Sequence, residues 1–127
     1  MSGYFVIKRK LPSLNEVIGK NRTNKYVGAQ FKADIEEAIA WDIRQALTSG
    51  TLKPVKKLCI VHFEWHEATR RRDADNIQSS QKFILDALVK NEVLTNDNRR
   101  YVKNTTHEII DDKEKKDFIV VRIEEIG

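Results

Sequence analysis

The sequence predicts one α+β domain over residues 1–127, with a mixed or antiparallel sheet and two main helices packed mainly on one face of that sheet. Residues 58–65 alternate between apolar and polar side chains, as a half-buried strand does, while residues 29–47 and 77–88 repeat apolar residues at helical spacing. The predicted elements follow the order strand, helix, strand, helix, strand, strand. With 127 residues, 40% of them hydrophobic and 33% charged, the chain is long enough to bury one core.

The first predicted strand covers residues 4–11 and is stopped by Pro12, which cannot donate to a sheet ladder. Residues 13–28 are rich in Asn, Gly, Lys and Arg, with Tyr26 among them. This composition favours a loop or short helix that approaches nucleic acid.

The predicted helix over residues 29–47 is amphipathic and ends at Ser49-Gly50. Trp41 lies off the centre of its apolar stripe, so that Trp41 either edges the core or packs against a second subunit. The stripe consists of Phe31, Ile35, Ala38, Ile39, Ile43, Ala46 and Leu47.

The next predicted strand, residues 58–65, has two different faces. The face expected to be buried consists of Cys59, Val61, Phe63 and Trp65. Because Cys59 is the only cysteine, an internal disulfide and a cysteine-based zinc cluster are excluded, and Cys59 is expected to act as a small buried hydrophobe. The spacing on the other face is compatible with a metal site but more typical of a solvated strand, and Glu64 or Glu67 could support a metal site as an outer partner. That face carries His62, Glu64 and His66.

The buried stripe of the second predicted helix consists of Ile77, Ile84, Leu85 and Leu88. At about 100° per residue, Lys82 projects away from this stripe, on the side that also carries Asp75, Ser79 and Asp86. Two interpretations of Lys82 stay open. Its stem reaches back toward a phosphate at the start of the helix, or it forms an i,i+4 ion pair with Asp86, worth a few tenths of a kcal/mol.

Residues 101–110 and 118–126 are predicted to form a hairpin of two strands, joined by the charged turn at residues 111–116. The acids in this turn are more typical of a solvated turn than of a catalytic centre. His107 has no evident partner in the sequence, and we assign it no role.

Carboxylates and arginines are concentrated between Arg70 and Asp97. Asp73 and Asp75 are one residue apart, so in an extended segment both carboxylates point the same way and can share a cation. Alternatively, Asp75 caps a helix, with Gln78 three residues on as in a capping box. Carboxylates hold hard Mg²⁺ ions that polarise a phosphate and activate water, and arginines bind neighbouring phosphates. This inventory predicts a nuclease that hydrolyses phosphodiesters.

The net charge of +4 is unevenly distributed along the chain. Residues 1–32 contain seven Lys or Arg and one acid, whereas residues 103–127 contain five bases and seven acids. The run Lys8–Lys10 taken alone is equally typical of a solvated face. Together with later arginines, the basic N-terminal part can form a positive surface around the carboxylates. The residues predicted to contact DNA are Asn15, Lys20, Arg22, Lys25, Arg70, Arg71, Arg72, Arg99 and Arg100.

Four segments follow one another in a characteristic order. They are Leu11-Pro12-Ser13-Leu14-Asn15, Arg71-Arg72-Asp73-Ala74-Asp75-Asn76, Lys82-Phe83-Ile84-Leu85-Asp86-Ala87-Leu88, and Asn96-Asp97 before a basic strand. The last three together resemble the RusA-type Holliday-junction resolvases, small Mg²⁺-dependent endonucleases common in phages and prophages. The first is similar to the Pro-x-Ser-x-Asn element near the start of that family, so the resemblance covers about residues 11–105.

The resemblance implies a role for each acidic motif and for one lysine. The metal site, for Mg²⁺ or alternatively Mn²⁺, would consist of Asp73, Asp75 and Asp97. The essential lysine maps onto Lys82. In short-spaced members of the family that lysine comes four residues after the second aspartate, at the position of Ser79 here. We prefer Lys82 because it keeps the four-residue spacing to Asp86, and because only a cation can offset charge on a scissile phosphate.

The resemblance also implies a homodimer whose two sites make paired nicks in a four-way DNA junction, in DNA recombination or repair. The expected function is therefore Holliday-junction resolution. Two alternatives stay open: a metal nuclease for flaps or single strands that uses the same carboxylates, and a non-enzymatic dimer that binds branched DNA. The longest apolar runs are too short to span a membrane and no signal peptide is evident, so we expect a cytoplasmic protein with no membrane partner.

Overall fold

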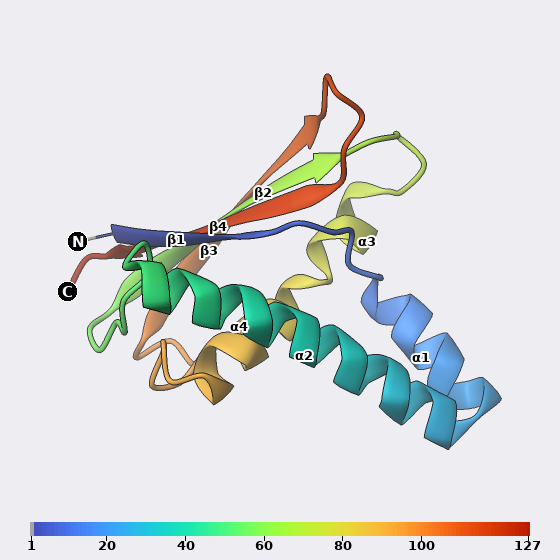
Figure 1. Ribbon diagram of the computed structural model, residues 1–127, viewed down its shortest axis with the longest axis horizontal. Coiled ribbons are helices and arrows are strands. Elements are labelled where there is room, and N and C mark those ends of the chain that lie inside the picture. Colours follow the sequence, from blue (N-terminus) through green and yellow to red (C-terminus); the bar gives the residue numbers. More distant parts are fainter. Residues whose placement is uncertain (1) are drawn as a thin grey trace.

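In the computed structural model, which describes residues 2–127, four strands form one mixed sheet with the order β1-β4-β2-β3 (Figure 1). The strands are β1 (Ser2–Ile7), β2 (Cys59–Glu67), β3 (Val102–Asp111) and β4 (Phe118–Glu125). β2 is parallel to β3 and antiparallel to β4, and β4 is antiparallel to β1. The prediction of an α+β domain with a mixed sheet is confirmed.

The predicted hairpin of the last two strands is wrong, because β2 lies between β3 and β4. His62 of β2 is opposite Thr106 of β3 on one side and opposite Arg122 of β4 on the other. The connection at residues 112–117 must therefore cross two strand spacings, about 10 Å, which six residues span easily. Apolar alternation identified each strand, but it contains no information about which strands are neighbours.

The first strand ends at Ile7 and not at Leu11. Ile7 is opposite Ile119, near the start of β4, so the ladder runs out of partner there. Leu11 is nevertheless buried, with 2% of its surface exposed, and belongs to the hydrophobic core.

Residues 13–28 are almost entirely helical, a larger extent than the predicted loop or short helix. They contain α1 (Leu14–Thr23) and the start of α2 (Lys25–Ser49). Ser13 caps α1 by accepting a hydrogen bond from Glu16 N, and Asn24 caps α2 by accepting from Tyr26 N and Val27 N. α2 ends at Gly50, whose φ of 85° is the left-handed conformation that glycine adopts without a steric penalty.

The single helix predicted through residues 77–88 is two helices, α3 (Ala74–Gln78) and α4 (Gln81–Lys90). Ser79 and Ser80 separate them. The Ser79 hydroxyl donates to Asn76 O, and the Ser80 hydroxyl donates to Pro12 O, both at short distance. Serine hydroxyls compete in this way with the continuous helical ladder, and here both also make tertiary contacts, since Ser79 Oγ accepts a hydrogen bond from Leu14 N.

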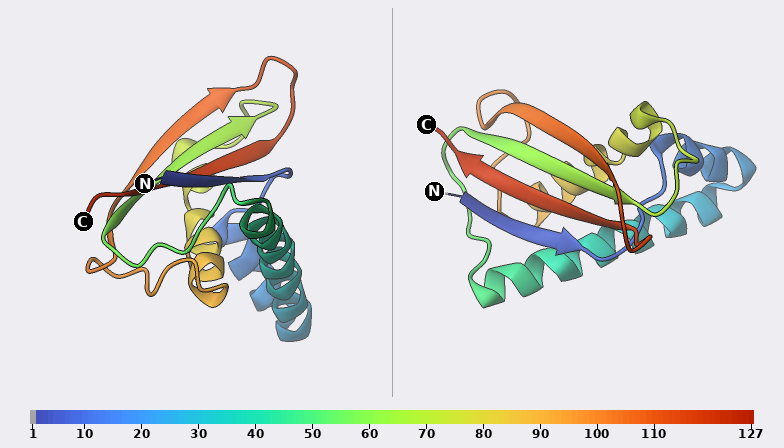
Figure 2. Two further views of the ribbon diagram at one scale, coloured as in Figure 1. Left: turned by 60° about the vertical axis from the view of Figure 1, so that its left-hand side comes forward. Right: turned by 90° about the horizontal axis from the view of Figure 1, so that it is seen from above.

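The helices lie on one side of the sheet (Figure 2). α2 and α4 bury their apolar stripes there, and one continuous core results. The sheet contributes the inward-facing residues Phe5, Ile7, Cys59, Val61, Phe63, Trp65, Val121 and Ile123 to it. α1 and the N-terminal half of α2 extend beyond the sheet as a helical hairpin (Figure 1). None of the helices in residues 2–127 combines the length and apolarity needed to cross a membrane.

Candidate active site

The N-terminal segment that begins α1 is bonded to the junction between α3 and α4. Residues more than 60 positions apart in the sequence are thereby held together by side-chain hydrogen bonds. The bonds are Ser80 Oγ to Pro12 O at 2.8 Å, Leu14 N to Ser79 Oγ at 3.1 Å and Asn15 Nδ2 to Asn76 Oδ1 at 3.4 Å. Two of the motifs that were separate in the sequence therefore form one structural unit.

Arg72 joins the end of β2 to the same unit. Its guanidinium forms a bidentate ion pair with Glu67, at 3.2 Å from Nε and 2.8 Å from Nη2, and donates from Nη1 to Leu11 O at 2.8 Å. Glu67 is buried and Arg72 is mostly buried, with 6% and 13% of their side chains exposed. The structure thus places Arg72, a predicted DNA contact, inside the protein, where it fixes the loop that leads to Asp73.

Asp73 and Asp75 lie at the start of α3, and both are exposed. Asp75 does not lie in an extended segment as predicted, because it is within the first turn of the helix. The capping alternative is also wrong in position: the N-cap residue is Asp73, and its carboxylate makes no capping hydrogen bond. Asp75 Oδ1 accepts a hydrogen bond from Asn76 N at 3.0 Å. Neither carboxylate forms an ion pair within residues 2–127, despite the three arginines just before them.

Lys82 lies between two carboxylates, at the exposed start of α4. Its Nζ is 3.1 Å from Asp86 Oδ1 and 3.8 Å from Asp97 Oδ2. The hydrogen bond with Asp86 raises the pKa of Lys82, and the negative charges of Asp86 and Asp97 add to the shift. Lys82 is therefore a cation at neutral pH. The i,i+4 pair with Asp86 is confirmed, and Asp86 is a partner whose position the sequence assigned only through helical spacing.

Asp97 is held in place by a loop that asparagine side chains stabilise. Asn96 Oδ1 accepts from Asp97 N at 2.7 Å and from Asn98 N at 3.1 Å, and Asn98 Oδ1 accepts from Arg100 N at 3.0 Å. Asparagine favours such turns because its short side chain can satisfy the backbone two residues ahead. The loop leaves Arg99 and Arg100 exposed, without an ion pair in the described part of the chain.

The other predicted DNA contacts differ in their availability. Arg70 is bonded to Asp111, with Nη2 2.7 Å from Oδ2, while Arg71 is exposed and has no acidic partner among residues 2–127. On the helical hairpin, Lys20 Nζ lies 5.9 Å from the ring centroid of Phe31, and Arg22 and Lys25 are exposed.

The chemistry of Asp73, Asp75 and Asp97 fits a hard divalent cation, because all three are carboxylates and two of them are exposed and unpaired. The structure does not gather a complete ligand set: within residues 2–127, no three His, Cys, Asp or Glu side chains are grouped closely enough to hold a metal ion. Mg²⁺ in phosphate-processing sites usually keeps several waters and is bound by one or two carboxylates together with substrate phosphates.

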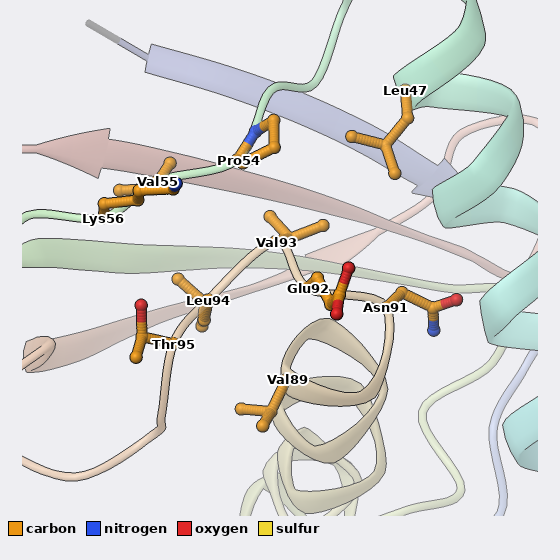
Figure 3. A pocket seen from close by; sticks show the side chains of 10 residues that line it. All are labelled: Leu47, Pro54, Val55, Lys56, Val89, Asn91, Glu92, Val93, Leu94 and Thr95. Carbon is orange, nitrogen blue, oxygen red and sulfur yellow. The ribbon is translucent and has the colours of Figure 1, made fainter.

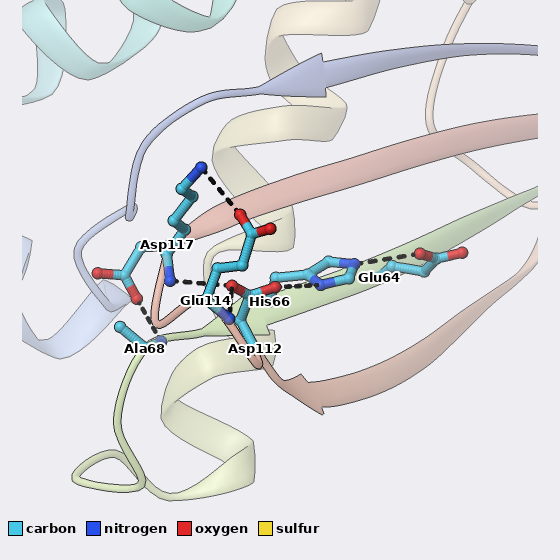
Figure 4. Close-up of polar contacts among 7 residues, drawn as sticks. Glu64, His66, Ala68, Asp112, Glu114 and Asp117 are labelled. Atoms are coloured by element: carbon cyan, nitrogen blue, oxygen red, sulfur yellow. Dashed lines mark hydrogen bonds and ion pairs between the residues drawn. The ribbon is translucent and has the colours of Figure 1, made fainter.

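The histidines of β2 have protein partners. His66 Nε2 is 3.2 Å from Glu64 Oε1, and its Nδ1 is 3.6 Å from Asp112 Oδ1 (Figure 4). The His66 ring also stacks on Phe118. In the same close-up, Asp117 accepts a hydrogen bond from Ala68 N. These contacts tie the turn after β3 to the loop after β2, which leads to the aspartates of α3.

His62 and His107 are also engaged. His62 Nδ1 is 2.6 Å from Thr106 Oγ1, and its Nε2 is 2.9 Å from Glu124 Oε1. His107, which had no evident partner in the sequence, accepts a hydrogen bond from Trp65 Nε1 at 3.0 Å, and burial lowers its pKa. A cross-strand contact between parallel strands leaves no local signal, so sequence reasoning had no means of finding it.

A hollow of about 740 Å³ lies at the far end of α4 (Figure 3). It contains none of the predicted site residues. Its lining consists of Leu47, Pro54, Val55, Lys56, Val89, Asn91, Glu92, Val93, Leu94 and Thr95.

No model of a known protein family matches this chain, and no curated protein matches it.

Proposed function

We propose that this chain is a RusA-type Holliday-junction resolvase, a Mg²⁺-dependent endodeoxyribonuclease that cuts four-way DNA junctions. One observation carries the proposal. The four segments that resemble the family are separate in the sequence, and contacts in the folded protein join them in two pairs. Arg72 and Asn76 of the second segment bond to Leu11 and Asn15 of the first, and Lys82 of the third contacts Asp97 of the fourth.

In this proposal the three aspartates and the lysine have separate chemical roles. Asp73, Asp75 and Asp97 would hold Mg²⁺, or alternatively Mn²⁺. When bound, the ion polarises the scissile phosphate and lowers the pKa of a water. Lys82 offsets the charge that develops on the phosphate, and Asp86 keeps the ammonium in position and protonated.

The surrounding residues orient the DNA and the acids. Arg71, Arg99 and Arg100 are exposed cations that can bind phosphates on either side of the cut. The buried pair of Arg72 and Glu67 fixes the loop that presents Asp73. Proper positioning of this kind matters because a displacement of about 1 Å can cost about 10²-fold in rate.

The proposed assembly is a homodimer. A four-way junction has two-fold symmetry, and a dimer brings two equivalent sites to strands of like polarity, so that both nicks are made in one complex. The process served would be DNA recombination or repair in a phage or prophage, and the site of action the cytoplasm.

The direct test is incubation with end-labelled four-way junction, flap and continuous duplex DNAs, each with Mg²⁺ and with EDTA. We expect paired nicks with 5′-phosphate and 3′-hydroxyl ends in the junction, only with Mg²⁺. If the flap is cleaved while the four-way junction stays intact, the protein is a flap nuclease and not a junction resolvase. Junction binding without any cleavage would leave only a branched-DNA-binding protein.

A further inference from the structure

The helical hairpin formed by α1 and the first turns of α2 has an exposed aromatic side chain at its tip. Tyr26 is 79% exposed, the largest value among the exposed large hydrophobic side chains described in residues 2–127. Asn24 Oδ1 accepts a hydrogen bond from Tyr26 N at 2.9 Å, so the backbone that carries the ring is fixed by the helix cap. An exposed ring on ordered backbone is a platform for a flat ligand.

The side chains that lie beside this ring on α2 are small. Ala29 and Ala33 follow Tyr26 at i+3 and i+7, on the same side of α2, and both are exposed. Short side chains there leave the ring face accessible to a stacked partner. A core or capping role for Tyr26 would instead bury the ring.

The tip is also strongly basic. Residues 18–32 contain four basic residues and no acidic one. All four basic side chains are exposed, without an ion pair in the described part of the chain. These basic residues are Lys20, Arg22, Lys25 and Lys32. Cations around an accessible aromatic ring fit a nucleic acid, because phosphates pair with the cations and every base has a face for stacking.

The end of the hairpin opposite the tip is hydrogen-bonded to the candidate active site. Leu14 N donates to Ser79 Oγ, just before the start of α4, the helix that carries Lys82. The 10 residues of α1 then rise about 15 Å to the tip, at 1.5 Å per residue. That length corresponds to roughly four nucleotides of one strand, at about 3.4 Å each.

We propose that this hairpin is a base-stacking arm. Tyr26 stacks on a nucleobase left accessible at a DNA branch point, and the four lysine and arginine side chains of the tip hold the flanking phosphates. The inference rests on the proposed function in that it takes branched DNA as the ligand. Continuous duplex offers no accessible base face, so Tyr26 contributes to branched DNA alone, whereas the cations contribute to both.

The test compares binding in EDTA, where no cleavage is needed, for a four-way junction and for a duplex of equal length. Tyr26→Ala should weaken junction binding about tenfold, the loss of one stacked base, and leave duplex binding unchanged. Tyr26→Phe keeps the ring and should bind as the wild type does. Tyr4→Ala removes an exposed tyrosine of β1, away from the hairpin, and should also bind normally. 2-Aminopurine at the branch point should change its fluorescence with wild type and Tyr26→Phe, but not with Tyr26→Ala.

Three outcomes would overturn the stacking arm. They are unchanged junction binding by Tyr26→Ala, an equal loss on junction and duplex, and a shift of Tyr26→Ala to a smaller oligomer in sedimentation with DNA affinity preserved, which would make the tip a subunit contact. An inactive wild type that still binds junctions through Tyr26 would defeat the proposed nuclease function and leave the stacking arm standing.

Discussion

Two neighbouring arginines, Arg71 and Arg72, face different environments. Arg72 is paired with the buried carboxylate of Glu67, whereas Arg71 is exposed. Arg72→Ala would leave Glu67 charged and unpaired inside the protein, so we expect the free energy of unfolding to fall by about 3 kcal/mol or more. Urea unfolding measures this loss.

Arg71→Ala is the matched control for that variant. It should change the free energy of unfolding by no more than about 0.5 kcal/mol, since no buried group loses a partner. If Arg71 contacts a phosphate, the salt dependence of DNA binding should weaken by about one unit of slope. An unstable Arg71→Ala, or a fully stable Arg72→Ala, would contradict the structural assignment of the two side chains.

Lys82 is expected to act on the phosphate and not on stability. Lys82→Met keeps most of the stem but removes the ammonium, so single-turnover cleavage should fall by about 10²-fold or more. The folded state should be little affected, because the pair with Asp86 is exposed and worth only a few tenths of a kcal/mol.

Lys90 offers a control on the same helix. It forms a similar exposed pair, with Nζ 2.8 Å from Glu36 Oε2, at the opposite end of α4. Lys90→Met should therefore cleave normally with the same small change in thermal stability. Normal cleavage by Lys82→Met would remove Lys82 from the mechanism, and a crippled Ser79→Ala beside it would indicate that the family's lysine position was assigned wrongly.

At the scale of elements, the end of α4 contains a correctable strain. Glu92 follows the helix with a φ of 61°, the left-handed conformation that favours glycine, and Val93 N bonds back to Leu88 O at 2.9 Å. Glu92→Gly removes a penalty of about 1–2 kcal/mol and adds about 0.5–1 kcal/mol of chain entropy in the unfolded state. We expect a net gain of about 0.5–1 kcal/mol in thermal unfolding.

Glu92→Ala separates the backbone effect from the charge. Alanine keeps the strained conformation and removes the carboxylate, so it should not reproduce the gain. A gain of equal size in both variants would assign the effect to the charge near the helix C-terminus.

The elements themselves were predictable where local pattern decides the structure. The buried positions of β2, from Cys59 to Trp65, follow from alternation, and the stripe of α2 follows from helical spacing. The break at Ser79 and Ser80 was not predictable, because it depends on a hydrogen bond to Pro12, far away in the sequence. For the same reason β3 and β4 were expected to pair, although β2 separates them.

At the candidate site, too, local contacts were predictable from the sequence and long-range contacts were not. The pair of Lys82 and Asp86 follows from i,i+4 spacing, which is a local property. The contact of Lys82 with Asp97, and the burial of Arg72 against Glu67, depend on how loops fold back onto the helices. Sequence reasoning identified the residue types needed for the chemistry but could not separate an arginine that binds the protein from one available to DNA.

For the whole molecule, the proposed paired nicks require two sites in one complex. We therefore expect a dimer in sedimentation at micromolar concentration, either in the free protein or on junction DNA. A protein that stays monomeric on junction DNA would favour the flap or single-strand nuclease, because one site cannot cut both strands symmetrically.

The central claim is that Asp73, Asp75 and Asp97 hold the metal ion for cleavage, and that Lys82 acts beside Asp97. The measurement that tests it most directly is single-turnover cleavage of a labelled four-way junction with Mg²⁺ by the wild type and Asp97→Asn, with binding measured in parallel. Glu37→Gln, a similar change in an exposed ion pair of α2, is the control and should cleave normally. Asp97→Asn should lose at least about 10²-fold in rate while binding persists or tightens, because the amide keeps the size but cannot supply the charge that the metal needs. Full cleavage by Asp97→Asn and by Asp75→Asn would contradict the claim.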